Sequence, residues 1–340
     1  MKGGINLIEN LVPIIFALKT LLTNMEKREI GSSGIKVYPF ALGGNVFGWT
    51  IDEQTSFNVL DGFLDAGLDF IDTADVYSAW APGNKGGESE TIIGKWLKKS
   101  GKRDKLIIAT KVGLPMGENK KGLSRKYITQ AVDDSLKRLQ TDYIDLYQSH
   151  RDDPDTPLLE TLETFDDLIK QGKVRAIGAS NYEGARLKEA LQVSEDNGLA
   201  AYQCLQPEYN LYAREHYEKD LEPICRERNI GVINYYSLAS GFLTGKYRSE
   251  NDLSQSARGQ GIKKFLEPRG YKILAALDKV AAEYNTTLAA VVLAWVIARP
   301  GITAPIASAT SIKQLEELTG ALSLVLNSDA IDLLNSASHY

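Results

Sequence analysis

Cysteine is scarce in this chain, since only Cys204 and Cys225 among its 340 residues carry a thiol. Two cysteines are too few for a disulfide framework, and neither lies in a CxxC or cysteine–histidine spacing typical of a metal site. We therefore expect two reduced thiols in the core of a cytoplasmic protein, and no metal centre.

Hydrophobic runs of membrane-spanning length are missing as well. The apolar run LVPIIFAL, residues 11–18, is too short to cross a bilayer. Glu9 before it, Lys19 after it and the lack of a small-residue cleavage site argue against a signal peptide. From residue 25 the chain reads as a complete opening hairpin. We expect a single domain over residues 25–340, with residues 1–24 as a disordered extension or the product of a misassigned start, and no membrane association.

The chain also lacks an excess of positive charge. It has 39 lysine and arginine residues against 44 aspartate and glutamate residues, a formal net charge of −5. The basic residues are scattered through predicted helices, so no cationic stripe would neutralise a polyanion. Nucleic acid is therefore not an expected partner.

What the sequence does contain is a regular alternation of strand and helix patterns, without a proline- or serine-rich linker. The predicted strands cover residues 39–44, 68–75, 105–113, 142–150, 173–181, 201–210, 231–240 and 301–309. The predicted helices follow Asp52, Ser124 and Ser311 and cover residues 88–99, 158–171, 184–197, 217–228, 271–284 and 288–298. Eight such repeats predict an α/β fold, one closed (β/α)8 TIM barrel with an N-terminal β-hairpin and extra helices near the C-terminus.

Reactive side chains lie at the ends of three of these strands: Asp72 and Tyr77 in FIDTADVY, Lys111 in LIIATKVG and His150 in YIDLYQSH. The carboxyl ends of barrel strands meet at one mouth, with neighbouring strands about 5 Å apart. We therefore expect the four groups within hydrogen-bond reach. An acid, a phenol, an ammonium and an imidazole together suit proton transfer to a carbonyl oxygen, where negative charge must meet a positioned donor.

Tyr77 needs help to act as an acid, because a phenol of pKa about 10 donates poorly at pH 7 unless a nearby cation stabilises its phenolate. Lys111 is that cation, and Asp72 would hold the ammonium. Taken singly, each residue also has a structural interpretation: Tyr77 as a rim residue, Asp72 and Lys111 as an ion pair, and His150 as a satisfied strand-end histidine.

Six segments, FIDTADVY, ATKVG, YIDLYQSH, KVRAIGASNY, QPEYNL and YYSLASGFLTGKY, occur in this order. On these segments the chain from about residue 25 to about residue 324 resembles an aldo-keto reductase. The resemblance implies a reversible NAD(P)H-dependent reduction of an aldehyde or ketone to an alcohol. It makes Tyr77 the proton donor, gives Lys111 and Asp72 the role of adjusting its acidity, and lets His150 orient the carbonyl and share the proton relay.

The resemblance also implies a nicotinamide cofactor bound without a Rossmann unit, and the chain has no GxGxxG between a strand and a helix. It places the carboxamide on Ser180, Asn181 and Gln206, and the ring on Tyr236. The pyrophosphate would lie on a stretch where glycines permit close backbone approach and a lysine supplies charge: Ser237, Leu238, Ser240, Gly241, Leu243, Gly245 and Lys246.

For the adenosine end the resemblance points to Ser308, Thr310 and Gln314, whereas Leu318 departs from the family pattern of an asparagine. Ser308, Thr310 and Lys313 suit a 2′-phosphate, so we favour NADPH, with NADH as the alternative. The glycine-rich, basic segment 248–269 is interpreted either as a clamp over the cofactor or as a flexible surface loop.

The sequence indicates less about the substrate and the partners. Trp49, Trp80 and Tyr212 suggest an apolar wall around a small-molecule carbonyl substrate. The natural substrate and the oligomeric state cannot be read from the sequence. Two other functions stay open: a nucleotide-binding, redox-sensing regulatory subunit resembling potassium-channel β subunits, and a Schiff-base aldolase in which Lys111 attacks a carbonyl.

Overall fold

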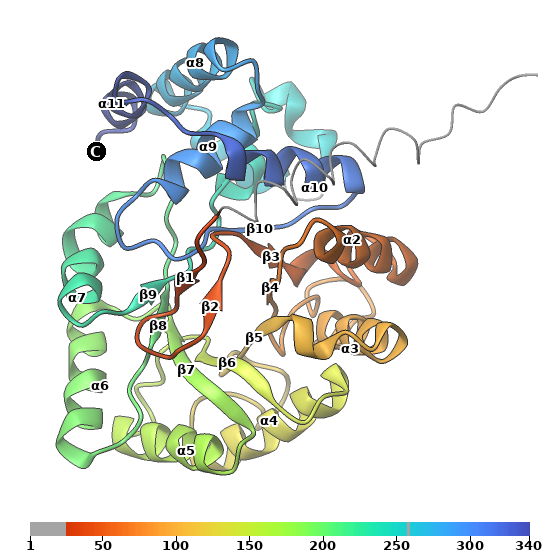
Figure 1. The fold of residues 1–340 in the computed structure, drawn as a ribbon, viewed down its shortest axis with the longest axis vertical. Helices are drawn as coiled ribbons and strands as arrows, with labels where there is room; N and C mark the ends of the chain where they lie inside the picture. Colours follow the sequence, from red (N-terminus) through yellow and green to blue (C-terminus); the bar gives the residue numbers. More distant parts are fainter. Residues whose placement is uncertain (1–24, 257–258) are drawn as a thin grey trace, which may run out of the picture.

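The computed structural model describes residues 25–256 and 259–340, and its parallel strands form a ring (Figure 1). The ring order is β10-β3-β4-β5-β6-β7-β8-β9. The strands are β3 (Ala41–Gly43), β4 (Phe70–Asp72), β5 (Ile107–Val112), β6 (Ile144–Ser149), β7 (Val174–Ser180), β8 (Cys204–Gln206), β9 (Gly231–Val232) and β10 (Ile306–Ala307). The amides of Thr303 and Ala304 donate to the Val232 carbonyl, which links β9 to the segment that enters β10. The predicted barrel is confirmed.

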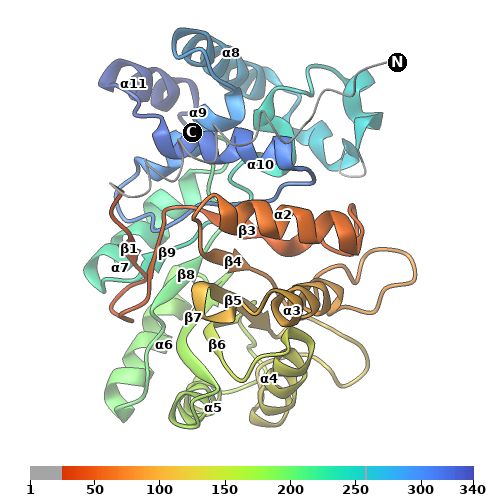
Figure 2. The same ribbon diagram turned by 45° about the vertical axis from the view of Figure 1, so that its right-hand side comes forward.

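Helices surround the ring on its outside (Figures 1 and 2). The α-helices are α2 (Glu53–Asp65), α3 (Glu88–Ser100), α4 (Arg125–Leu139), α5 (Leu158–Lys170), α6 (Gly184–Asn197), α7 (Glu222–Glu227), α8 (Pro268–Glu283), α9 (Leu288–Ile297), α10 (Ile312–Thr319) and α11 (Ser328–Ala337). Shorter helical turns cover Gly44–Val46, Arg103–Lys105, Tyr217–Leu221, Ala239–Thr244, Glu250–Gln255, Gly259–Phe265 and Gly320–Ser323. The side chains of Asp52, Ser124 and Ser311 cap α2, α4 and α10 as predicted.

The N-terminal hairpin, β1 (Arg28–Glu29) and β2 (Lys36–Val37), lies across one opening of the ring in Figure 1. Its apolar residues Ile30, Ile35 and Val37 are buried with the small and apolar side chains that fill the ring. The hairpin therefore plugs the end of the barrel at which the strands begin. The opposite end, where the strands finish, stays available for a site.

All eight strands are shorter than predicted, most of all those expected over 201–210, 231–240 and 301–309, which reduce to β8, β9 and β10. In the second of these segments, Tyr236 (φ 54°) and Ala239 (φ 48°) adopt left-handed backbone conformations that cannot continue an extended strand. The apolar pattern that predicted a strand therefore continues beyond β9 into an irregular loop.

Both cysteines are buried and free, as predicted. The prediction made for residues 1–24 lies outside the described residues. Across the ranges that the structure describes, no single helix is long and apolar enough to cross a membrane; α8 and α9 meet that test only as a pair bent by 96°.

Candidate active site

A fully buried lysine is the centre of a hydrogen-bonded group at the carboxyl end of the ring. Lys111 Nζ donates to Asp72 Oδ2 and to the Thr73 carbonyl, both at 2.8 Å, and to Tyr77 Oη at 3.0 Å. An ammonium has three hydrogens, so each of them has an acceptor. Burial lowers the pKa of Lys111, while the Asp72 carboxylate opposes that effect.

Asp72 is held equally firmly on its other side. Its Oδ1 accepts from Gln206 Nε2 at 2.9 Å and from Gln148 Nε2 at 3.5 Å. Gln148 was not among the predicted site residues. It precedes His150 by two positions on the same strand, and residues two apart share a face, so the period of the strand could have revealed it.

Tyr77 projects over this group and is only partly buried. Its ring centroid lies 4.7 Å from Lys111 Nζ and 6.0 Å from the centroid of the His150 ring. The structure thus brings together all four residues that the sequence proposed for proton transfer. Burial, and after it the Asp72 carboxylate, raise the pKa of Tyr77 well above its ordinary value. The expected lowering of the Tyr77 pKa by Lys111 is not found in this arrangement, because burial and the Asp72 carboxylate both disfavour the phenolate.

His150 is neutral at physiological pH. Burial, followed by the charges of Lys111 and Arg151, lowers its pKa well below the ordinary range. Its Nδ1 is buried and, among the described residues, has no hydrogen-bond partner. The imidazole, whose centroid lies 6.0 Å from that of the Tyr77 ring, therefore has hydrogen-bonding capacity at Nδ1 that the described residues do not use.

The three residues expected at a carboxamide lie side by side at the ends of β7 and β8. Asn181 Nδ2 donates to the His150 carbonyl at 3.0 Å and to Ser180 Oγ at 2.9 Å, and Ser180 Oγ donates to the Gln206 carbonyl at 2.9 Å. Tyr235, which the sequence did not single out, donates to Asn181 Oδ1 at 2.8 Å. These contacts attach the expected carboxamide residues directly to the proton-transfer group.

Tyr236 is 47% exposed, and its backbone has a left-handed conformation. A bulky residue rarely adopts this conformation, and such strain concentrates at functional sites. The Asn210 side chain fixes the turn by donating to the Tyr236 carbonyl at 3.0 Å. The loop thus presents a broad aromatic ring to solvent at a defined position.

The loop after Tyr236 contains three consecutive left-handed residues, Ala239, Ser240 and Gly241. Successive amides in left-handed and turn conformations form a concavity that suits an anion. A Cβ added to Gly241 would lie 3.7 Å from Lys246 Nζ, so the lysine folds back over this turn. The Lys246 charge expected for a pyrophosphate therefore lies over this turn, whose Ala239 and Gly241 amides donate to the carbonyls of Tyr236 and Leu238.

Other residues predicted to bind the pyrophosphate contribute to the packing of the loop. Ser237 is buried and donates to the Ile306 carbonyl at 2.9 Å, and Leu243 is fully buried, so only its backbone can face a ligand. Leu238 is half-buried, and Gly245 ends the turn with φ 78°.

The residues expected at the adenosine end form two separate pairs. Ser308 Oγ donates to Asn45 Oδ1 at 2.7 Å, and the Thr310 hydroxyl donates to Gln314 Oε1 at 2.8 Å. Leu318 is buried in the apolar core. At this position the chain therefore has a packing residue where the family pattern has an asparagine.

The segment 248–269 is anchored to the barrel through buried apolar residues, Leu253, Ile262 and Phe265. Phe265 stacks on Phe242 with ring centroids 5.2 Å apart. The described part of this segment is therefore packed against the loop that carries the left-handed turn, which fits the interpretation as a clamp better than that as a loose surface loop.

Two of the three aromatic residues expected at the mouth form a group with Tyr77. The rings of Trp49 and Trp80 meet edge to face at 5.5 Å, and Trp80 lies 6.0 Å from Tyr77. The third, Tyr212, packs on Phe265 with ring centroids 4.8 Å apart, and its hydroxyl donates to Glu267 Oε1 at 3.1 Å. The described residues hold no group of three or more metal-ligating side chains.

Fold and site together define a (β/α)8 barrel with a hydrogen-bonded group of ionisable side chains at the carboxyl ends of its strands. The family model of the aldo/keto reductase family matches residues 39–339. The chain is 36% identical over 313 residues to the aldo-keto reductase YhdN of Bacillus subtilis, covering 90% of each chain. It is 35% identical over 318 residues to the uncharacterised oxidoreductase YrpG of the same organism, covering 92% of this chain and 95% of the relative. The chain belongs to the aldo/keto reductase family, which supports oxidoreduction of carbonyl compounds in general.

A further relative has a different kind of name. The chain is 33% identical over 310 residues to a probable voltage-gated potassium channel subunit beta of Arabidopsis thaliana, covering 88% of this chain and 92% of the relative. Similarity at this level therefore extends to proteins named for enzymatic and for channel-associated roles.

Proposed function

We propose that this protein is a cytoplasmic, NADPH-dependent reductase that converts an aldehyde or ketone reversibly into an alcohol. The observation that carries the proposal is the contact of Lys111 Nζ with both Tyr77 Oη and Asp72 Oδ2 at the mouth of the barrel. A phenol held over an ammonium, with a neutral imidazole beside it, is an arrangement for protonating an oxygen as it becomes negative.

In this proposal Tyr77 supplies the proton. Its raised pKa keeps the phenol protonated near neutrality, so the proton is available until the substrate oxygen becomes basic enough to take it. Lys111 then stabilises the phenolate that forms, through the 3.0 Å contact that is already made. The neutral His150 donates a hydrogen bond that orients the carbonyl. In the reverse direction the same phenolate accepts the proton of an alcohol.

The nicotinamide cofactor supplies the hydride when it is bound. The residues present fit it: Tyr236 offers an exposed ring, Asn181 and Gln206 offer amide groups beside the proton-transfer group, and the left-handed turn with Lys246 suits a pyrophosphate. The preference for NADPH rests on Ser308, Thr310 and the exposed Lys313, which would face a 2′-phosphate, and NADH is the alternative.

The test is the loss of reduced-nicotinamide absorbance with NADPH, and separately with NADH, against a panel of aromatic aldehydes, dicarbonyls and ketones. We expect turnover in the wild type and roughly a thousandfold loss in Tyr77→Phe, with cofactor affinity retained, because only the transferable proton is removed. Full turnover by Tyr77→Phe would refute the assignment of the proton donor.

A second candidate function comes from the relatives named as potassium channel β subunits. In that case the same site binds the cofactor as a redox-sensing regulatory subunit. Tight NADPH binding without turnover of any carbonyl in the panel would favour this function.

The aldolase alternative is disfavoured by the structure, because Lys111 is fully buried and all three ammonium hydrogens have acceptors. An amine in this state is a poor nucleophile. Borohydride trapping of a substrate on Lys111 would instead support the aldolase.

A further inference from the structure

A cavity of about 560 Å³ lies at the end of the barrel opposite the mouth. It is bounded by β1, the end of α7, the start of β9 and the connection from α9 toward β10. Figures 1 and 2 both place β1, α7 and β9 side by side at this end. Three arginines line the cavity, Arg28, Arg226 and Arg299, together with one carboxylate residue, Glu29.

Arg28 lacks a counter-charge. Its Nη1 donates to the Ile302 carbonyl at 2.7 Å, but no carboxylate of the described residues forms an ion pair with it. Burial lowers its pKa, and no neighbouring charge opposes the shift. A partly desolvated guanidinium without an anion is costly, so an anion in the cavity would relieve that cost.

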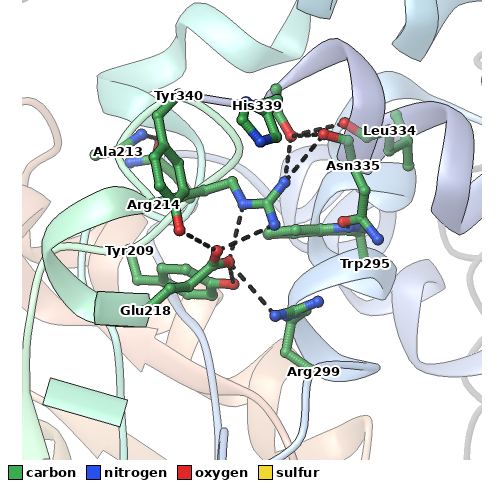
Figure 3. Close-up of polar contacts among 12 residues, drawn as sticks. Tyr209, Ala213, Arg214, Glu218, Trp295, Arg299, Leu334, Asn335, His339 and Tyr340 are labelled. Carbon is green, nitrogen blue, oxygen red and sulfur yellow. Dashed lines mark hydrogen bonds and ion pairs between the residues drawn. The ribbon is translucent and has the colours of Figure 1, made fainter. Parts of the chain in front are cut away.

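Arg299 and Arg226 are only weakly neutralised. Arg299 Nη2 lies 3.4 Å from Glu218 Oε1. That carboxylate is already bound by Arg214 at 2.8 and 3.1 Å and by the Tyr209 hydroxyl at 2.7 Å, as Figure 3 shows. Arg226 is exposed and lies 4.0 Å from Glu222, at the limit of an ion pair. Arg226 therefore keeps most of its positive charge available, whereas Arg299 shares the Glu218 carboxylate with Arg214.

The neutral groups around the cavity also suit an anion. The hydroxyl of Tyr217 is buried and unpartnered among the described residues, and lies 3.8 Å from where a Cβ on the lining residue Gly301 would be. Burial raises the pKa of the lining Cys225 to about 12, so that its thiol adds no negative charge. Glu29 accepts a hydrogen bond from the Gly34 amide at 2.8 Å and is committed to the hairpin turn.

We propose that this arginine cavity binds a compact phosphate-bearing anion, either an inorganic phosphate or a small phosphate ester. Guanidinium groups pair with phosphate through two parallel hydrogen bonds, and arginines from three separate elements would surround the anion. The volume falls within the range of small-molecule sites. The hairpin residues Ile30, Ile35 and Val37 separate the cavity from the mouth, so the site is distinct from the one proposed for the cofactor.

The test is calorimetric titration of the full-length protein at low ionic strength with inorganic phosphate and, separately, with glycerol 3-phosphate, which distinguishes the two sources. We expect one equivalent to bind. Affinity should fall tenfold or more in Arg28→Gln and in Arg226→Gln, because each removes a charge-assisted hydrogen bond. Arg226→Lys should lie between Arg226→Gln and the wild type.

The matched control removes one positive charge elsewhere. Lys188→Gln on the exposed face of α6 should change phosphate affinity less than twofold. Loss of binding in Lys246→Gln would place the anion at the mouth, and an equal loss in Lys188→Gln would reduce the effect to net charge; either result overturns the proposal, as does the absence of binding. Arg226 is exposed, so Arg226→Gln is expected to fold. If Arg28→Gln does not fold, the phosphate affinity of Arg226→Gln alone tests the proposal.

Discussion

The two sides of the mouth are built in different ways. On one side, Asp72, Lys111 and Gln206 project from regular strands and are fully or almost fully buried in mutual hydrogen bonds. On the other side, the loop from Tyr236 to Lys246 is irregular, left-handed at several residues and partly exposed. The first side holds charges that must not move, whereas the second exposes backbone and ring surfaces that a ligand would cover.

This difference follows from what each side must stabilise. A buried ion pair keeps its charge only when every hydrogen bond is made, and neighbouring strands fix atoms well enough for that. An anion cradle needs amides that are not consumed by a strand ladder, so the chain leaves the β conformation where the cradle begins. Substitutions on the first side should therefore affect stability and turnover together, and those on the second mainly ligand affinity.

The largest effect is expected for Lys111→Met. It leaves the buried Asp72 carboxylate without its cation, which costs roughly 3–5 kcal/mol in the free energy of unfolding. The value of kcat/KM should fall by roughly a thousandfold or more, because the phenolate of Tyr77 loses its stabilising charge. Urea unfolding and steady-state kinetics measure the two effects.

The double variant Lys111→Met with Asp72→Leu separates them. It removes both charges, so stability should recover while activity does not. Recovery of activity would show that Lys111 has only a structural role.

Gln206 and Gln148 allow a comparison within the first side, since both donate to Asp72 Oδ1 but at 2.9 Å and 3.5 Å. Gln206→Leu should lower the free energy of unfolding by about 1.5–3 kcal/mol, as expected for a hydrogen bond to a charged group. Gln148→Leu should cost less than about 1 kcal/mol, because its contact is long. Equal losses in chemical unfolding would contradict the ranking by distance.

On the second side, Lys246→Gln should weaken binding of both NADPH and NADH by about tenfold while leaving kcat and the unfolding midpoint nearly unchanged. Lys313→Gln is the informative partner, since it should weaken NADPH alone if that residue faces a 2′-phosphate. Calorimetric titration with each cofactor measures both. A large loss of stability in Lys246→Gln would contradict the proposed division between the two sides.

The last effect is on pH dependence and concerns a buried carboxyl that, unlike Asp72, has no hydrogen-bond partner among the described residues. Burial, and then the charge of Glu90, raise the pKa of Asp75 to about 8. Between about pH 4 and 8 the folded protein therefore holds a proton that the unfolded chain releases, and stability falls as pH rises. Asp75→Asn should raise Tm by several degrees at pH 8 and by little at pH 5.

The exposed Asp104→Asn is the matched control and should show no such pH dependence. A gap in Tm between Asp75→Asn and the wild type that stays constant from pH 5 to pH 8 would show that the carboxyl titrates normally.

Much of the site could be predicted because its residues follow strong local patterns. Asp72, Lys111 and His150 each end an apolar run, and the parallel barrel brings such ends together whatever the loops do. Gln148 was missed because a glutamine inside a strand has no signal beyond its period. The contact of Tyr212 with Phe265 could not be predicted, because a loop aromatic gives no indication of the residue against which it packs.

The sequence by itself determined the order of strands and helices, the capped helix starts and the family, because these depend on periodicity and on short motifs. Only the tertiary structure decided which groups are charged and which are free to bind. The raised pKa of Tyr77, the unpartnered Nδ1 of His150 and the arginines without full counter-charges all depend on burial and on neighbours distant in the chain. Desolvation is a property of three-dimensional surroundings, and local sequence does not encode it.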